Sequence, residues 1–380
     1  MRILSIFIAL FLFSSCSSPF LNSIIYKKQE AKTPQKSSKT HQESLIVKDA
    51  KVNTNIIKIT KEEKKQDIKK EVKQEIKKQI PIKNIKLPYK KIAFVGDSHF
   101  ASDYISAYFR NALGIYSLGF IPAILPKWHN QYLAKYNNSG FKVEYLINTK
   151  DNLSFSGINA NCLDNCEINI DLGFMANDIE YLEFKSGIWN FKNYKKNTNK
   201  INFKLSSSKI GGFLSNNSSY IDNLGINGAS IFNYLRIDDE LAFKVAKKLD
   251  YDLVVFSFGT NESVSNKINQ EMFLNNYKKI INIFKSTNTK IILLIPPEPT
   301  LYVNKNYVKG ENNELVRTLI KKVAKENGAY IFNIDELMQK EGGKAAWIAN
   351  KKSLKNTHLS KLGYDYVALK LLEFLKITKD

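Results

Sequence analysis

Apolar runs of strand length alternate with amphipathic stretches of helix length from residue 91 onward, with one interruption. The continuous apolar runs predict strands at 91–95, 219–224, 252–257, 290–295 and 329–333. Apolar residues at helical spacing predict helices at 101–113, 237–249, 269–285, 312–327 and 360–376. Strands that are apolar throughout belong in a parallel sheet covered on both faces. The pattern therefore predicts an α/β fold in three layers, with the parallel sheet in the middle.

The interruption covers residues 138–215. Short stretches of strand character are separated there by Asn, Ser and Gly turns, at 141–147, 167–172, 180–184 and 201–205. This pattern is typical of antiparallel β structure, so we expect a β-rich module inserted between the first two strands of the α/β domain. Its aromatic residues allow two interpretations, a face that stacks on sugar or ordinary core packing. They are Trp189, Phe191 and Tyr194.

The amino terminus has the pattern of an export signal. Arg2 precedes an apolar run from residue 3 to residue 13, which is short for a membrane span. Ser14 and Ser15 then precede Cys16, which resembles a bacterial lipoprotein signal. The resemblance implies a lipoprotein signal at residues 1–16, with cleavage before Cys16 and attachment of lipid to that cysteine.

A polar segment, residues 17–87, follows the leader. It is rich in Lys, Glu, Gln and Ser and nearly free of aromatic residues, so it favours a solvated tether rather than a core. Within the tether, apolar residues recur every fourth position and predict a charged helix at Ile68, Val72, Ile76 and Ile80.

The net charge indicates which kinds of partner the chain can bind. The 57 Lys and Arg against 36 Asp and Glu give a formal net charge of +21. No nucleic-acid-binding motif accompanies this charge, so we expect attraction to an anionic envelope polymer or membrane surface and no nucleic-acid partner.

Besides Cys16, the chain has Cys162 and Cys166. In an oxidising compartment they favour a small-loop disulfide over a metal site, because no second Cys or His pair stands nearby.

Polar motifs follow the first three predicted strands of the α/β domain. They are Gly96-Asp97-Ser98, the stretch 225–230 (GINGAS) and the stretch 259–262 (GTNE). Because the carboxyl ends of parallel strands meet at one edge, these motifs are expected to converge. A fourth motif, His358-Leu359-Ser360, precedes the last predicted helix.

These motifs, in this order, resemble the four blocks of the SGNH (GDSL-type) hydrolases. The GINGAS and GTNE forms, with a long insertion after the first block, are most similar to the peptidoglycan O-acetylesterases. The resemblance covers residues 88–380. It implies a flavodoxin-like α/β/α hydrolase domain formed by 88–137 and 216–380, with a carbohydrate-binding-like module at 138–215. It implies no cofactor and no metal.

The resemblance also implies roles for individual residues. Ser98 would be the nucleophile and His358 the general base. The backbone N–H groups of Ser98 and Gly228 and the side-chain amide of Asn261 would stabilise the oxyanion. Gly225 replaces Gly228 if the register differs. Two further histidines are expected nearby, His99 as a supporting residue and His129 as a loop residue or substrate contact.

The chain departs from the family where an acid orients the histidine. The family carries an Asp two or three residues before it, and this chain has Asn356 and Lys355 there. Three interpretations stay open. Ser98 and His358 form a dyad with Asn356 as orienter, which we favour, or activity is lost, or another acid serves; the candidate acids are Asp335, Glu336 and Glu262.

From these features we expect a lipid-tethered serine esterase that removes O-acetyl groups from peptidoglycan through an acyl-enzyme on Ser98. It would face the periplasm, at the outer membrane, with O-acetylated peptidoglycan or another envelope polysaccharide as its partner and the membrane reached through the lipid anchor. One alternative keeps the site but transfers the acyl group to envelope polysaccharide. The other is a non-catalytic wall-binding lipoprotein whose site has decayed.

Overall fold

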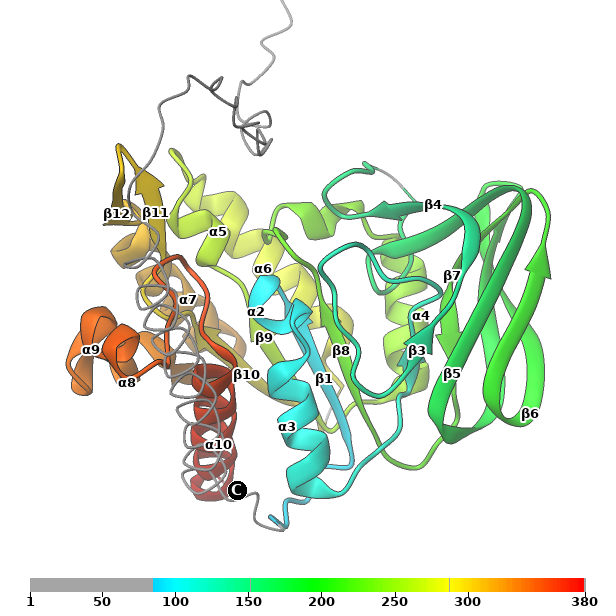
Figure 1. Ribbon diagram of the computed structural model, residues 1–380, viewed down its shortest axis with the longest axis horizontal. Helices are drawn as coiled ribbons and strands as arrows, with labels where there is room; N and C mark the ends of the chain where they lie inside the picture. Colours follow the sequence, from blue (N-terminus) through cyan, green and yellow to red (C-terminus); the bar gives the residue numbers. More distant parts are fainter. Residues whose placement is uncertain (1–84, 151, 287, 379–380) are drawn as a thin grey trace, which may run out of the picture. The chain divides into compact units, whose positions relative to one another are not determined.

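The computed structural model describes residues 85–150, 152–286 and 288–378 (Figure 1). The predicted leader, Cys16 and the tether up to residue 84 lie outside these described residues. The folded domain begins before the predicted boundary at residue 88. Ile85 is only 8% exposed, and its N–H donates to the carbonyl of Ala112 at 3.1 Å. The last residues assigned to the tether are therefore part of the core.

A five-stranded parallel sheet forms the centre of the α/β domain, in the order β13-β10-β9-β1-β8. Every residue of β9 and β10 is buried, as expected for strands covered on both faces. The strand bounds lie within one residue of the predicted ones: β1 (Lys91–Gly96), β8 (Tyr220–Gly225), β9 (Leu253–Ser257), β10 (Lys290–Ile295) and β13 (Tyr330–Asn333).

Helices cover both faces of this sheet, and the alternation of strand side chains assigns them. Val95 of β1 points into the core under α4 (Asp239–Leu249), α6 (Gln270–Phe284) and α7 (Asn313–Asn327). Its neighbour Phe94 points into the opposite core, under α3 (Tyr104–Leu113), α8 (Ile334–Lys340), α9 (Gly343–Ala349) and α10 (Lys361–Ile377). Because successive strand residues face opposite sides, one sheet supports both layers. The predicted three-layer α/β fold is confirmed.

Several short elements were not predicted. α2 (Ser98–Ala101), α5 (Thr260–Ser263) and the 3₁₀ helix η1 (Asn233–Arg236) follow the ends of β1, β9 and β8. A hairpin of β11 (Thr300–Val303) and β12 (Asn306–Lys309) follows β10. No helix in the described part of the chain is long and apolar enough to cross a lipid bilayer.

The insertion forms a separate antiparallel sheet of six strands, confirming the predicted fold class with its inserted β domain. Two short strands before residue 138 also join this sheet, so the β structure begins earlier than predicted. The strands are β2 (Phe120–Ile121), β3 (Lys135–Tyr136), β4 (Ser139–Tyr145), β5 (Ile158–Lys185), β6 (Ile188–Leu205) and β7 (Ser208–Leu214).

One side of this sheet shares its core with the α/β domain. Phe155 packs on Phe284 of α6 with ring centroids 5.3 Å apart, and Leu182 belongs to the same cluster. The three aromatic residues left open by the sequence are used in packing. Trp189 and Phe191 contact this shared core, and the hydroxyl of Tyr194 forms hydrogen bonds with backbone atoms of Asn202.

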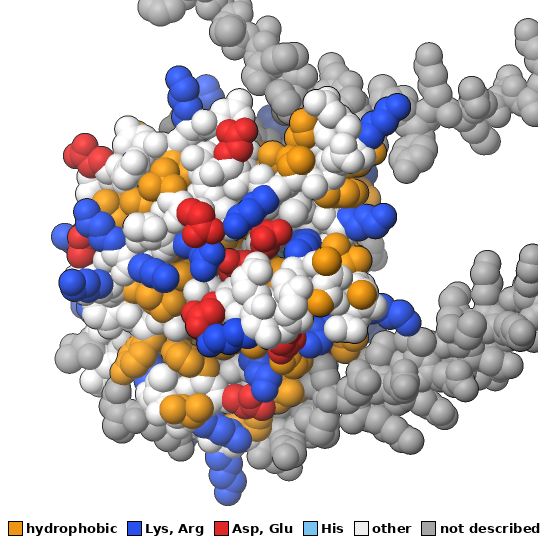
Figure 2. All heavy atoms as spheres, turned by 90° about the vertical axis from the view of Figure 1, so that its left-hand side faces the viewer, with side chains coloured by type: hydrophobic (Ala, Val, Ile, Leu, Met, Phe, Trp, Pro, Cys, Tyr) orange, Lys and Arg blue, Asp and Glu red, His pale blue; other side chains and the backbone are white. Residues whose placement is uncertain are grey.

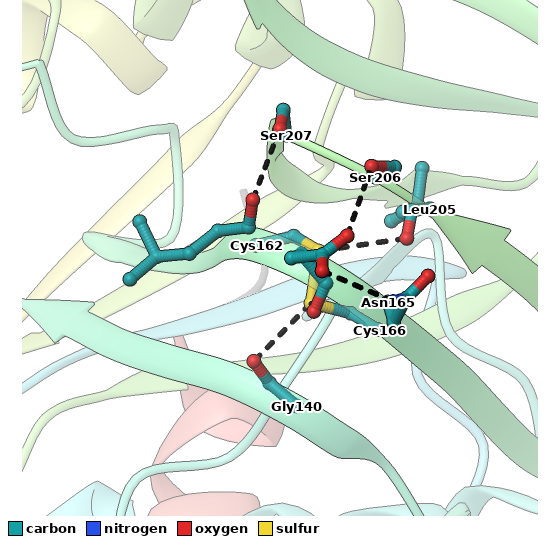
Figure 3. The surroundings of a disulfide bond; sticks show 9 residues. Gly140, Cys162, Asn165, Cys166, Leu205, Ser206 and Ser207 are labelled. Atoms are coloured by element: carbon teal, nitrogen blue, oxygen red, sulfur yellow. Dashed lines mark hydrogen bonds between the residues drawn. A yellow bond between two sulfur atoms is a disulfide. The ribbon is translucent and has the colours of Figure 1, made fainter.

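Cys162 and Cys166 form a disulfide at a bulge of β5 (Figure 3). Phe141 of β4 pairs with Cys162, whereas Ser139 pairs with Glu167, so four residues of β5 lie opposite the single residue Gly140 of β4. Polar contacts fasten this loop to the turn between β6 and β7. Ser207 Oγ, for example, donates to the carbonyl of Leu163 at 2.9 Å (Figure 3). The disulfide therefore joins the two ends of the bulge.

We expect loss of this disulfide to destabilise the folded chain moderately. A loop of five residues corresponds to about 2 kcal/mol in the loop-entropy treatment. Cys162→Ser should lower the free energy of unfolding in urea by about this amount, and Cys166→Ser should match it. Leu163→Ser, within the exposed bulge, serves as the control and should change little. An unchanged urea midpoint on reduction of the wild type would contradict the expectation.

Candidate active site

Ser98 lies where β1 ends against its neighbouring strand. A Cβ at Gly96 would overlap the carbonyl oxygen of Ser257 in β9, so the position requires glycine. Asp97 then caps α2, its Oδ1 accepting from the N–H of His99 at 3.0 Å. Ser98 is the first residue of α2, and its own N–H has no acceptor within the helix. The serine hydroxyl is thus held at the carboxyl edge of the sheet, beside an N–H group able to bind an anion.

His358 reaches Ser98 from the loop between α9 and α10. Its Nε2 lies 2.9 Å from Ser98 Oγ, within hydrogen-bond range. A backbone hydrogen bond closes this loop: the N–H of Leu354 donates to the carbonyl of His358 at 3.0 Å. A serine and a histidine at this distance have the arrangement of an activated nucleophile and its general base.

The predicted oxyanion donors lie after the two strands that flank β1. Gly228, in the turn after β8, has φ 76°, a conformation that glycine adopts without strain. Asn261 of α5 donates one Nδ2 hydrogen to the carbonyl of Ala229 at 2.6 Å, and its second hydrogen is available for another acceptor. Gly225 instead packs on α2, where a Cβ would overlap the backbone of Phe100, so Gly228 suits the donor role better.

The Glu262 side chain connects the turn after β8 with the turn after β9. The side chain is 2% exposed, and its carboxylate accepts from the N–H of Ile231 at 2.6 Å and from the N–H of Gly259 at 3.0 Å. The first donor follows β8 and the second follows β9. The carboxylate is therefore engaged in fixing the two turns around Ser98 rather than in orienting His358.

The structure corrects the predicted role of Asn356. Its Oδ1 accepts from the backbone N–H of His358 at 3.0 Å and so shapes the loop instead of holding the imidazole ring. The other ring nitrogen, Nδ1, lies 3.5 Å from Thr357 Oγ1, at the outer limit of a hydrogen bond.

The remaining candidate acids have other partners. Asp335 pairs with Arg317 at 2.8 Å and accepts from Gln339 at 3.2 Å. Glu336 lies on the surface and pairs with Lys340 at 2.7 Å. No hydrogen bond joins either carboxylate to His358 in the described part of the chain. The geometry is that of a Ser–His dyad.

A lysine that the sequence did not reveal stands beside the dyad. Lys344 Nζ, from α9, donates to the carbonyl of Asn356 at 2.7 Å and to that of Glu298 at 3.3 Å, joining the His358 loop to the loop after β10. Burial lowers the pKa of Lys344 to about 8. Burial, and then the charge of Lys344, lower the pKa of His358 below its usual value. A neutral imidazole, the form that accepts a proton, is thereby favoured.

The two other nearby histidines have supporting positions. His99 is buried, with Nδ1 3.1 Å from the hydroxyl of Tyr364, and burial holds its pKa well below the usual range. His129 accepts at Nε2 from the N–H of Asn227 at 3.2 Å and so holds its loop against the turn after β8. No cluster of His, Cys, Asp or Glu suited to a metal ion occurs among the residues the structure describes.

The site and fold can be compared with known proteins. The model of the GDSL-like lipase/acylhydrolase family matches residues 208–366, which confirms the resemblance seen in the sequence. This match includes Gly228, Asn261 and His358, whereas Ser98 lies before it because the β insertion separates the first motif from the others. A search of curated proteins finds no match to the chain.

Among solved structures, a peptidoglycan O-acetylesterase superposes with a TM-score of 0.67 and 16% sequence identity, covering 80% of this chain and 93% of that one. This similarity establishes the shared fold, including the insertion. A lipase/acylhydrolase from Enterococcus faecalis (TM-score 0.34, 17% identity, 41% of this chain and 75% of that one) is more distant. So is an acetylxylan esterase from Geobacillus stearothermophilus (TM-score 0.31, 15% identity, 41% and 71%).

Removing the charge of Lys344 should raise the pKa of His358. A cation beside the ring disfavours the protonated imidazole, so Lys344→Met stabilises the protonated form and moves the titration to higher pH. Because burial is the larger cause of the lowered pKa, part of the depression should remain. The measurement is an NMR titration of the His358 ring.

Lys344→Arg keeps the charge and serves as the matched control, with a titration close to that of the wild type. The same titration midpoint in Lys344→Met, with the protein still folded, would show that this charge does not act on His358.

Proposed function

We propose that this protein is a serine esterase that removes O-acetyl groups from envelope polysaccharide, with peptidoglycan as the main substrate. The observation that carries the proposal is the 2.9 Å contact between Ser98 Oγ and His358 Nε2 at the carboxyl edge of the parallel sheet. The fold shared with a peptidoglycan O-acetylesterase supports the choice of substrate.

The reaction follows from the arrangement of these groups. Neutral His358 accepts the proton of Ser98 as Oγ attacks the acetyl carbonyl. The N–H groups of Ser98 and Gly228 and the amide of Asn261 receive the charge that develops on the carbonyl oxygen, each donor contributing about 3 kcal/mol. The imidazolium then returns the proton to the departing sugar oxygen, and water releases acetate from the acyl-enzyme.

The dyad lacks a carboxylate that would stabilise the imidazolium. In a serine protease, replacing that carboxylate by an amide lowers turnover by about 10⁴. Lys344 adds a positive charge near the ring, which disfavours the imidazolium further. These two features favour one second candidate, a wall-binding protein that holds O-acetylated glycan without turning it over.

Acetate release separates the two candidates. The purified protein should release acetate from O-acetylated peptidoglycan, and Ser98→Ala should lower the rate by at least about 10³, because nucleophile and base act as a unit. Ser218→Ala, at an exposed serine of the loop before β8, is the matched control and should retain the wild-type rate. Wall binding without any acetate release by the wild type would favour the binding protein. Acetyl groups recovered on an added sugar acceptor would indicate acyl transfer instead.

The proposal places the enzyme on a lipid anchor in the cell envelope. Ser14-Ser15-Cys16 after a short apolar run supports lipidation, and the +21 charge supports association with anionic polymers. Mass spectrometry of the mature amino terminus should find a diacylglyceryl or triacylated Cys16. Cys16→Ser should abolish the modification and move the protein from the membrane fraction to the soluble one. A mature chain that starts elsewhere, or an unmodified Cys16, would contradict the anchor.

A further inference from the structure

Exposed aromatic side chains lie at two places along the carboxyl edge of the parallel sheet, on either side of Ser98. Tyr302 and Tyr307 of the β11–β12 hairpin are 63% and 47% exposed. Trp128, in the loop between β2 and β3, is 74% exposed. The site described above uses none of these three residues. Exposed apolar side chains that form a contiguous patch, as the neighbouring Tyr302 and Tyr307 do, often mark a binding surface.

Two hydrogen bonds attach the β11–β12 hairpin to segments that carry residues of the candidate active site. At its base, Thr300 Oγ1 donates to the carbonyl of Lys355 at 2.7 Å, in the loop that carries His358. Just beyond it, the N–H of Asn312 donates to the carbonyl of Ser263 at 3.1 Å, in the helix that carries Asn261. The hairpin is therefore attached both to the His358 loop and to the helix that carries Asn261, and Figure 1 shows it near α5.

The pairing register places the two tyrosines together. Tyr302 pairs with Tyr307 across the hairpin, with ring centroids 4.9 Å apart. Because side chains alternate along a strand, both tyrosines share a face with Thr300, the residue bound to the His358 loop. Figure 2 shows the side of the molecule that bears this hairpin together with α8 and α9, where apolar side chains reach the surface between charged ones.

Trp128 is held at the opposite end of the edge. The N–H of Asn130 donates to the carbonyl of Ala101, at the end of the helix that begins with Ser98, at 3.0 Å. Trp128 has φ 72°, an uncommon conformation for a bulky residue, and its neighbour His129 binds the N–H of Asn227. The surrounding contacts thus impose a backbone that leaves the indole in solvent.

The order of strands sets the spacing of these groups. Four neighbouring strands lie in the order β10-β9-β1-β8. The hairpin follows β10, Ser98 follows β1, and the turn bound by His129 follows β8. Three strand steps correspond to about 14 Å. A small ester bound at Ser98 cannot span this distance, whereas a chain of several sugar rings can.

We propose that Tyr302 with Tyr307 and, at the other end, Trp128 are stacking positions for a polysaccharide that crosses the carboxyl edge of the sheet. The apolar C–H faces of sugar rings pack on the faces of aromatic rings, which bury large areas at low entropic cost. A glycan held at both positions presents the acetyl group of a middle ring to Ser98. This inference rests on the proposed esterase function and names its substrate class as a polymer rather than a free sugar ester.

Binding to O-acetylated peptidoglycan tests the stacking positions without turnover. In the full mature chain carrying Ser98→Ala, Trp128→Ala and the double change Tyr302→Ala/Tyr307→Ala should each weaken cosedimentation with the polymer by roughly 3- to 10-fold. Tyr116→Ala, at an exposed tyrosine just after α3, is the matched control and should bind like its parent. Equal binding by all of these variants would overturn the inference.

Kinetics provide the second readout. With Ser98 intact, the same changes should lower kcat/KM on the polymer relative to 4-nitrophenyl acetate, mainly through KM, and KM of the wild type should fall as soluble O-acetylated fragments lengthen. A wild type that releases no acetate from any substrate rejects the esterase function, while the binding result still decides on the stacking positions. If light scattering instead shows that the aromatic changes dissociate a dimer, the surface binds a second copy and the inference is overturned.

Discussion

The close approach of three backbone segments at the carboxyl end of β1 is the constraint on which the site depends. Gly96 lies against β9 so closely that a side chain would overlap the Ser257 carbonyl, and Gly225 of β8 lies against α2 in the same way. These two glycines pair with each other across β1 and β8. Without side chains at both positions, α2 can begin directly over the end of β1. Ser98 thereby stands between the turns that supply Gly228 and Asn261.

The electrostatics around the dyad favour a neutral base. Burial is the main cause that lowers the pKa of both His99 and His358, and the charge of Lys344 lowers each of them further. Asp97, beneath the serine, is fully buried, and burial raises its pKa to about 7. Burial therefore disfavours the ionised form of this carboxyl. In such a site the imidazole is neutral and available to accept the serine proton, but the imidazolium that results is poorly stabilised. In the proposed reaction, the donors around the oxyanion therefore carry a larger share of catalysis.

Much of the fold was predictable because buried elements leave a periodic apolar pattern. The five parallel strands and the five long helices were found within a few residues of their predicted bounds. The short helices α8 and α9 were missed because seven residues hold only two turns of periodicity. Lys344 went unrecognised for the same reason, since its role depends on the position of α9. Asn356 was misassigned because spacing along the chain cannot tell a contact with the imidazole from a contact with the backbone N–H of His358.

The hairpin escaped prediction for a different reason. Its apolar residues, Tyr302 and Tyr307 among them, lie in solvent, so no buried stripe marks the two strands in the sequence. The stacking role proposed for these tyrosines bears on the missing acid. Binding energy from parts of a substrate remote from the reacting bond can offset the loss of a catalytic group by holding that bond in place. A dyad that proceeds slowly on a free ester gains most from a polymer fixed on both sides of Ser98. In this proposal the exposed aromatic residues hold the substrate in position beside Ser98. This positioning offsets the absence of a carboxylate that would stabilise protonated His358.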